Sequence, residues 1–98
     1  MRPQKLDDAA VKQALAAIPG WEIAGDGKSI RRTFVFRDFS EAFGFMTRVA
    51  LAAETLDHHP DWSNVYKTVE VTLNTHDAGG LTQLDFDLAG KMNRIAGR

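Results

Sequence analysis

The sequence predicts an α+β fold in which a four-stranded antiparallel sheet carries three helices on one face, in the order α-β-β-α-β-β-α. Apolar residues recur at helical spacing in three stretches, and apolar and polar residues alternate in the stretches between them. A Gly-Asp-Gly turn joins the first two strands. A chain of 98 residues with 44% hydrophobic composition has enough apolar side chains for one core, so we expect a single domain over residues 1–98.

The first third of the chain predicts a helix followed by a hairpin. Residues 6–20 carry apolar side chains on one side of a helix, which Asp7 caps and Pro19-Gly20 ends. Residues 21–36 then alternate between apolar and polar side chains after a Gly-Asp-Gly turn, which is typical of two antiparallel strands.

The central helix, expected over residues 38–58, has an apolar stripe that covers about half of its circumference. A helix that covers one sheet needs a narrower stripe. We therefore interpret the excess as packing against the other helices, and a contact between subunits is the alternative. The stripe consists of Phe39, Ala42, Phe43, Phe45, Met46, Val49, Ala50, Ala53 and Leu56.

The last third predicts a second pair of strands and a closing helix. A short strand is expected around residues 64–66 and a half-buried strand over residues 68–73, where apolar and polar residues alternate. Residues 78–80, Ala-Gly-Gly, form a turn, and residues 81–95 place five apolar side chains at helical spacing. Asp85 lies three residues after Thr82, as in a capping box, so we expect a structural role for it.

Composition excludes several classes of function. The absence of cysteine excludes disulfides, thiolate nucleophiles and Cys-ligated zinc. A net charge of −1 with scattered basic residues does not favour direct binding of nucleic acid. The N-terminus lacks the apolar run of a signal peptide, and no stretch approaches the ~20 apolar residues of a membrane span, so we expect a cytoplasmic protein.

All three histidines lie at two junctions of the predicted elements. His58 and His59 end the central helix immediately before Pro60, and His76 follows the strand 68–73. Each histidine taken alone is explained by helix termination or by a hydrogen bond at a strand end. Their confinement to two junctions, where rigid elements aim side chains into loops, instead favours a shared functional site. Glu54, four residues before His58, is expected on the same helix face.

Two chemistries use three imidazoles. A metal site with three His ligands requires the neighbours His58 and His59 to converge on one ion, which is awkward without a bend in the chain. General acid–base catalysis needs no such convergence, and imidazole titrates near neutral pH, at ~6.5. The chain offers no serine elbow and no glycine-rich phosphate loop. We therefore expect acid–base chemistry on a small polar molecule, with no metal and no cofactor.

The spacing of these residues resembles the motif of the pterin-4a-carbinolamine dehydratases. The motif positions are Glu54, His58-His59-Pro60, Tyr66, His76 and Asp85, and the surrounding stretches "HHPDWSNVY" and "VTLNTHDAGGLT" match as well. The resemblance extends from about Trp21 to Ile95. Several fixed positions over more than thirty residues make this motif far more specific than a pair of histidines.

The resemblance implies a hydro-lyase that dehydrates 4a-hydroxytetrahydropterin (4a-hydroxytetrahydrobiopterin) to quinonoid dihydropterin and so supports tetrahydropterin recycling. It implies His58, His59 and His76 as catalytic residues, with Glu54, Asp57 and Trp62 in support. Trp62 either borders the pocket or packs in the core, and for Tyr66 a core position is expected. The residues implied to bind the pterin are His58, His59, Pro60, Thr75, His76, Asp77 and Ala78.

The resemblance also implies partners. We expect a homo-oligomer, a tetramer or a dimer, and an aromatic amino acid hydroxylase as the enzyme that supplies the substrate. The alternative function is a protein-binding module, a dimerisation cofactor or regulator of a transcription factor or hydroxylase. It would use the apolar face of the central helix around Phe45, Val49 and Leu56.

Overall fold

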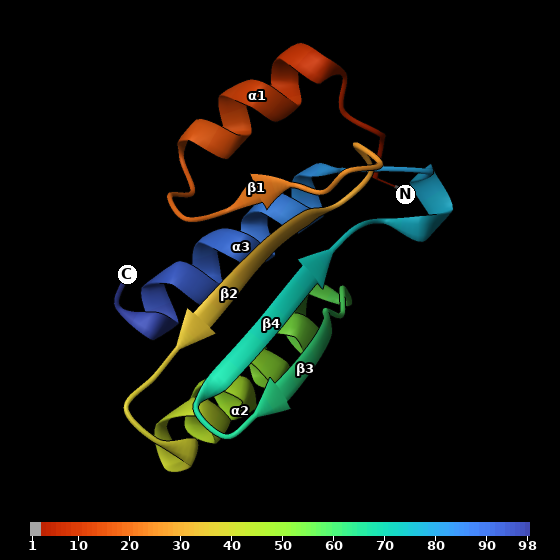
Figure 1. The fold of residues 1–98 in the computed structure, drawn as a ribbon. Coiled ribbons are helices and arrows are strands. Elements are labelled where there is room, and N and C mark those ends of the chain that lie inside the picture. The colour runs from red at the N-terminus through yellow and green to blue at the C-terminus, as the bar shows by residue number, and fades with distance from the viewer. Residues whose placement is uncertain (1–2) are drawn as a thin grey trace.

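Four antiparallel strands form one twisted sheet, and two of the helices lie against one of its faces (Figure 1). The computed structural model describes residues 3–98. The strand order is β1-β2-β4-β3, and α2 and α3 lie behind the sheet while α1 lies alongside β1 (Figure 1). The elements are α1 (Asp8–Ala16), β1 (Glu22–Ile23), β2 (Ile30–Val35), α2 (Phe39–Leu56), β3 (Asp61–Val65), β4 (Thr68–Leu73), a 3₁₀ turn (His76–Ala78) and α3 (Gln83–Ala96). The predicted fold class and element order are confirmed.

The central strands β2 and β4 supply the apolar floor of the core. Their register places Ile30 opposite Leu73 and Phe34 opposite Val69, and all four side chains are buried. The residues between them point to the other face, because successive side chains of a strand alternate. That face carries exposed polar side chains such as Thr33 and Glu70. The core therefore lies on one side of the sheet only.

Local caps define where α1 and α3 begin. The Asp7 carboxylate accepts the backbone N–H of Ala10 at 2.8 Å, which confirms the predicted cap of α1. At the start of α3, the Asp85 carboxylate accepts the backbone N–H of Thr82 at 2.9 Å, which confirms the predicted capping box. Both bonds satisfy N–H groups that a helix start leaves without a partner.

The interpretation of the apolar stripe on α2 is wrong in part. Ala42, Phe45 and Val49 are buried, so the face that we offered to a protein partner belongs to the core of the same chain. Phe39 and Phe43 instead remain 49% and 54% exposed and belong neither to the buried core nor to the partly buried side chains packed against it. Helical periodicity shows that the stripe is wide, but it does not show which half of it the sheet covers.

No helix in the described part of the chain combines the length and apolar composition that a bilayer crossing requires.

The connection from β3 to β4 also differs from expectation. The strand predicted around residues 64–66 begins earlier and spans Asp61–Val65. Tyr66 lies in the turn that follows, with a positive φ of 53°, and it is exposed rather than part of the core. The polar residues of an edge strand obscure the alternating pattern that identifies a central strand.

Candidate active site

The end of α2 separates the two adjacent histidines. Asp57 closes the helix in the left-handed conformation, with φ 51° and ψ 43°. Its N–H donates to the Glu54 carbonyl and the His58 N–H donates to the Ala53 carbonyl, which is the hydrogen-bond pattern of a Schellman motif. The reversal turns His58 inward, where it is 8% exposed, and leaves His59 exposed. The two rings are thereby free to serve different purposes.

A buried carboxylate holds the His58 ring. His58 Nε2 lies 2.6 Å from Oδ1 of Asp85, a residue that is 0% exposed. An ionised carboxylate only accepts hydrogen bonds, so Nε2 carries the proton and donates it. No other hydrogen bond to the ring is made within residues 3–98, and no buried side-chain nitrogen there lacks a partner. Nδ1 is therefore the ring nitrogen that is open to solvent.

Two threonines complete the environment of Asp85. The Thr75 hydroxyl donates to Asp85 Oδ2 at 2.9 Å and lies 2.8 Å from the Thr82 hydroxyl. Because the Thr75 proton goes to the carboxylate, the Thr82 hydroxyl must donate to Thr75. The first turn of α3 further favours a negative charge, since backbone N–H groups point toward it. Asp85 thus connects α3, the chain after β4 and the His58 ring.

His59 belongs to an exposed pair. Its Nε2 lies 2.8 Å from Oε1 of Glu54, and both side chains are more than half exposed. We expected Glu54 to share a helix face with His58, and that expectation is wrong. The helix ends at Leu56, so His58 leaves the helical path and His59 takes its place beside Glu54.

The turn after β4 presents the third histidine. The backbones of Thr75 and Gly80 exchange hydrogen bonds at 3.0 and 3.4 Å, and they close a loop around the 3₁₀ turn His76–Ala78. Gly79 follows with φ 77°, a conformation that glycine adopts without strain. Thr75 is buried and fixed by its bonds to Asp85 and Thr82, whereas His76 is exposed.

All three histidines line one cleft of about 330 Å³, which we call the histidine cleft. An adjoining space of about 440 Å³ shares Asp57, His58, Thr75 and Asp77 with it, so the two form one continuous site. The second space, which we call the apolar lobe, adds apolar wall residues. The residues of the histidine cleft are Asp57, His58, His59, Asn74, Thr75, His76 and Asp77. The apolar lobe adds Pro3, Leu56, Ala78 and Leu84.

Three predicted residues lie outside this site. The lining of the two spaces does not include Glu54, Pro60 or Trp62, although Glu54 pairs with His59. Trp62 is half-buried opposite Val71 and packs against the core, which was the alternative that we gave for it. Asn74 lines the histidine cleft but was not among the predicted residues, although its position directly before Thr75 at a strand end was a usable signal.

The site contains groups for proton transfer. Imidazoles both donate and accept protons near neutral pH, and Asp57 and Asp77 add carboxylates to the cleft. Within residues 3–98, no three His, Cys, Asp or Glu side chains converge in the way that a metal ion requires. The arrangement can bind a small polar molecule and move protons onto and off it.

Comparisons with known proteins agree on one family. The family described as pterin 4 alpha carbinolamine dehydratase matches residues 4–95. A relative from Mesorhizobium japonicum, provisionally named pterin-4-alpha-carbinolamine dehydratase, is 67% identical over 99% of each chain. One from Chelativorans sp. with the same provisional name is 60% identical over the whole of both chains.

Solved structures show the same fold. The crystal structure of a transcriptional coactivator/pterin dehydratase from Brucella melitensis is 50% identical and superposes with a TM-score of 0.93, over 96% of this chain and 100% of that chain. A pterin dehydratase-like protein, described as a RuBisCO assembly factor in the alpha-carboxysome, has a TM-score of 0.69 over 80% of this chain and 90% of that one. At 20% identity this second likeness concerns the fold alone.

Proposed function

The chain belongs to the pterin 4 alpha carbinolamine dehydratase family, and from this premise we propose that it removes water from 4a-hydroxytetrahydropterin by histidine acid–base catalysis. The observation that carries the proposal is the meeting of three imidazoles in one cleft, one of them held by a buried carboxylate. The product is quinonoid dihydropterin, and no redox change accompanies the reaction.

The proposed chemistry needs two proton transfers that balance. The C4a hydroxyl accepts a proton and its C–O bond breaks, so that water leaves. N5–H loses a proton as the nitrogen lone pair forms the C4a=N5 double bond. One proton enters the substrate and one leaves it, so the protein returns to its starting state through exchange with solvent. Positioned acid–base groups accelerate such steps by ~10²–10⁴-fold.

We assign proton donation to His58 or His76. With Nε2–H committed to Asp85, a protonated His58 presents Nδ1–H as its remaining donor. His76 lies on the exposed turn and exchanges protons readily with water. His59, paired with Glu54 at the rim, holds the pterin ring or assists the removal of the N5 proton. Thr75, Asp77 and Ala78 complete the proposed ring contacts.

A second candidate function is protein binding through α2. The exposed aromatic side chains of Phe39 and Phe43 favour it, because burial of such side chains stabilises association. We propose self-association through this face, while a regulatory partner remains the alternative.

An aromatic amino acid hydroxylase that forms the carbinolamine in the cytoplasm is the proposed source of substrate.

The direct test of the activity is a stopped-flow assay. Freshly generated 4a-hydroxytetrahydropterin is mixed with the protein, with and without a chelator, and formation of the quinonoid product is followed by absorbance. We expect clear acceleration over spontaneous dehydration, unchanged by the chelator. A folded protein that does not accelerate the reaction would contradict the proposal.

A further inference from the structure

A second cleft lies at the opposite ends of α2 and α3 from the histidine cleft. It has a volume of about 380 Å³, and its lining includes Arg37, Gly44 and Arg48 from the first part of α2 and the segment before it. Arg98 after α3 borders it as well. The buried rings of Phe36 and Phe45 form part of its wall. Nothing in the proposed dehydration uses this space.

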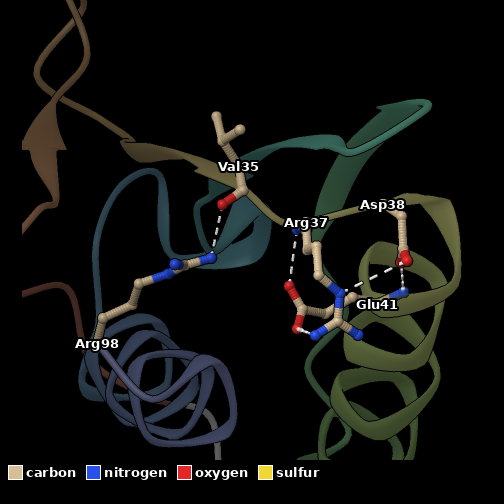
Figure 2. A network of polar contacts seen from close by, with 5 residues as sticks. All are labelled: Val35, Arg37, Asp38, Glu41 and Arg98. Atoms are coloured by element: carbon tan, nitrogen blue, oxygen red, sulfur yellow. Dashed lines mark hydrogen bonds and ion pairs between the residues drawn. The ribbon is translucent and has the colours of Figure 1, made fainter.

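Three arginines and one side-chain carboxylate, that of Glu41, line the cleft, on a chain whose net charge is −1. Figure 2 shows that Arg37 is engaged with Asp38 and Glu41, at 3.6 and 3.9 Å. Arg98 donates Nη2 to the Val35 carbonyl at 2.6 Å, which fixes the guanidinium in place and leaves further N–H donors (Figure 2).

Neither Arg48 nor Arg98 forms an ion pair within residues 3–98, and the Arg48 side chain is exposed. Arg32 lies outside the cleft lining, and the pKa of its guanidinium is lowered, first by burial and then by the charge of Arg98.

Gly44 keeps the cleft open at a cost to the helix. Glycine inside a helix is less favourable than alanine by roughly 0.5–1 kcal/mol. Neither conformation nor packing requires it here, because its φ is not positive and a Cβ atom at this position would meet nothing within 4 Å. The missing side chain therefore leaves space that no other part of the described chain fills.

We propose that this cleft binds a phosphorylated small molecule whose apolar part packs beside Gly44 and the Phe36–Phe45 wall. Guanidinium groups match phosphate oxygens in geometry and charge. Arg48 and Arg98 come from different elements, and the Ser40 hydroxyl also lines the cleft. A phosphate has three acceptor oxygens and can engage all three groups, whereas a carboxylate has two. The inference is independent of the proposed dehydratase activity.

The test is an NMR titration of the ¹⁵N-labelled full chain with phenyl phosphate, inorganic phosphate and phenol. We expect saturable shifts confined to residues 40–48 and 95–98, with phenyl phosphate at least about fivefold tighter than inorganic phosphate and phenol without effect. Arg48→Gln should weaken the affinity for phenyl phosphate roughly tenfold, because it removes a charge-assisted hydrogen bond. Gly44→Leu should abolish binding and leave the melting temperature unchanged or raised.

Arg94→Gln is the matched control, because it removes the same charge from an exposed position of α3 that does not line the cleft. It should change the affinity less than twofold. Equal weakening by Arg94→Gln and Arg48→Gln would indicate diffuse attraction and overturn the proposal. Shifts that avoid residues 40–48, or unaltered binding in a folded Gly44→Leu protein, would overturn it as well.

Discussion

Asp85 has two structural roles, because it caps α3 and holds the His58 ring. One carboxylate oxygen accepts from the Thr82 N–H and the Thr75 hydroxyl, and the other accepts from His58 Nε2. The same side chain therefore starts α3 and fixes the tautomer of a proposed catalytic ring. A buried carboxylate in this position is expected to orient the ring without contacting the substrate.

The substitution Asp85→Asn tests both roles, with stability as the readout of one and kcat as the readout of the other. It keeps the size of the side chain but removes the charge, and we expect a stability loss of about 1–3 kcal/mol from weakened buried hydrogen bonds. We also expect kcat for dehydration to fall roughly tenfold or more with a smaller change in KM, since a misoriented imidazole transfers protons poorly. The ring ¹⁵N shifts of His58 should report a changed tautomer; unchanged shifts and kcat would contradict the positioning role.

The spacing of Thr82 and Asp85 was sufficient to predict the capping box, because that interaction is local. It could not predict the bond to His58, which is 27 positions away in sequence. That contact depends on the left-handed residue Asp57, whose conformation turns one histidine inward and the other outward. Glycine is the usual signal for this conformation, and aspartate is a weaker one.

At the scale of elements, Asn93 joins α3 to the sheet and to the connection after α1. Its Oδ1 accepts from Trp21 Nε1 at 2.9 Å and from Arg32 Nη1 at 2.7 Å. Its Nδ2 donates to the Pro19 carbonyl at 3.0 Å. The Arg32 guanidinium also lies over the Phe34 ring, 4.3 Å from its centroid. The Asn93 amide thus links α3 by hydrogen bonds to β2 and to the connection after α1.

Asn93→Ala should destabilise the protein by about 1–3 kcal/mol, because it leaves the Trp21 indole N–H without its acceptor and removes one of the three acceptors of Arg32 Nη1. Urea unfolding monitored by tryptophan fluorescence gives the free energy of unfolding. Lys91→Ala is the control, because Lys91 also lies on α3 and its side chain makes no hydrogen bond within residues 3–98. It should change the free energy of unfolding little. Equal stability of the two variants would show that the network contributes nothing.

The elements themselves were largely predictable, and the orientation of α2 was not. Alternation in residues 30–36 and 68–73 identified β2 and β4 because both strands have one buried and one exposed face. In α2, apolar residues occupy more of the surface than the sheet can cover. Phe45 faces the core, where its ring packs against Phe34 and Phe36, and no pattern local to the helix distinguishes it from the exposed Phe43.

At the scale of the whole molecule, the exposed apolar side chains of α2 are the basis of the proposed self-association. Phe39 and Phe43 lie on one side of α2, and their ring centroids are 5.6 Å apart. Burial of a large side chain stabilises an association by roughly 1.5–3 kcal/mol. A small domain gains more from such contacts than a large one, because its own core is limited.

Sedimentation velocity tests this self-association. The wild-type protein should sediment as an oligomer of its 10.8 kDa chain, and Phe39→Ser/Phe43→Ser should shift it toward the monomer. Val35→Ser is the matched control, since Val35 is equally exposed but lies on the outer face of the sheet. A monomeric wild-type protein, or a control that dissociates as readily, would refute the role of this face.

The central claim is that the imidazoles of the histidine cleft drive the dehydration. The most direct measurement is the stopped-flow rate of the His58→Ala/His76→Ala double variant beside wild type and His76→Ala, with folding verified by circular dichroism. We predict that the double variant loses about 10²–10⁴-fold of the acceleration, and that His76→Ala loses less. A folded double variant that dehydrates 4a-hydroxytetrahydropterin at the wild-type rate would place the catalysis elsewhere and contradict the account.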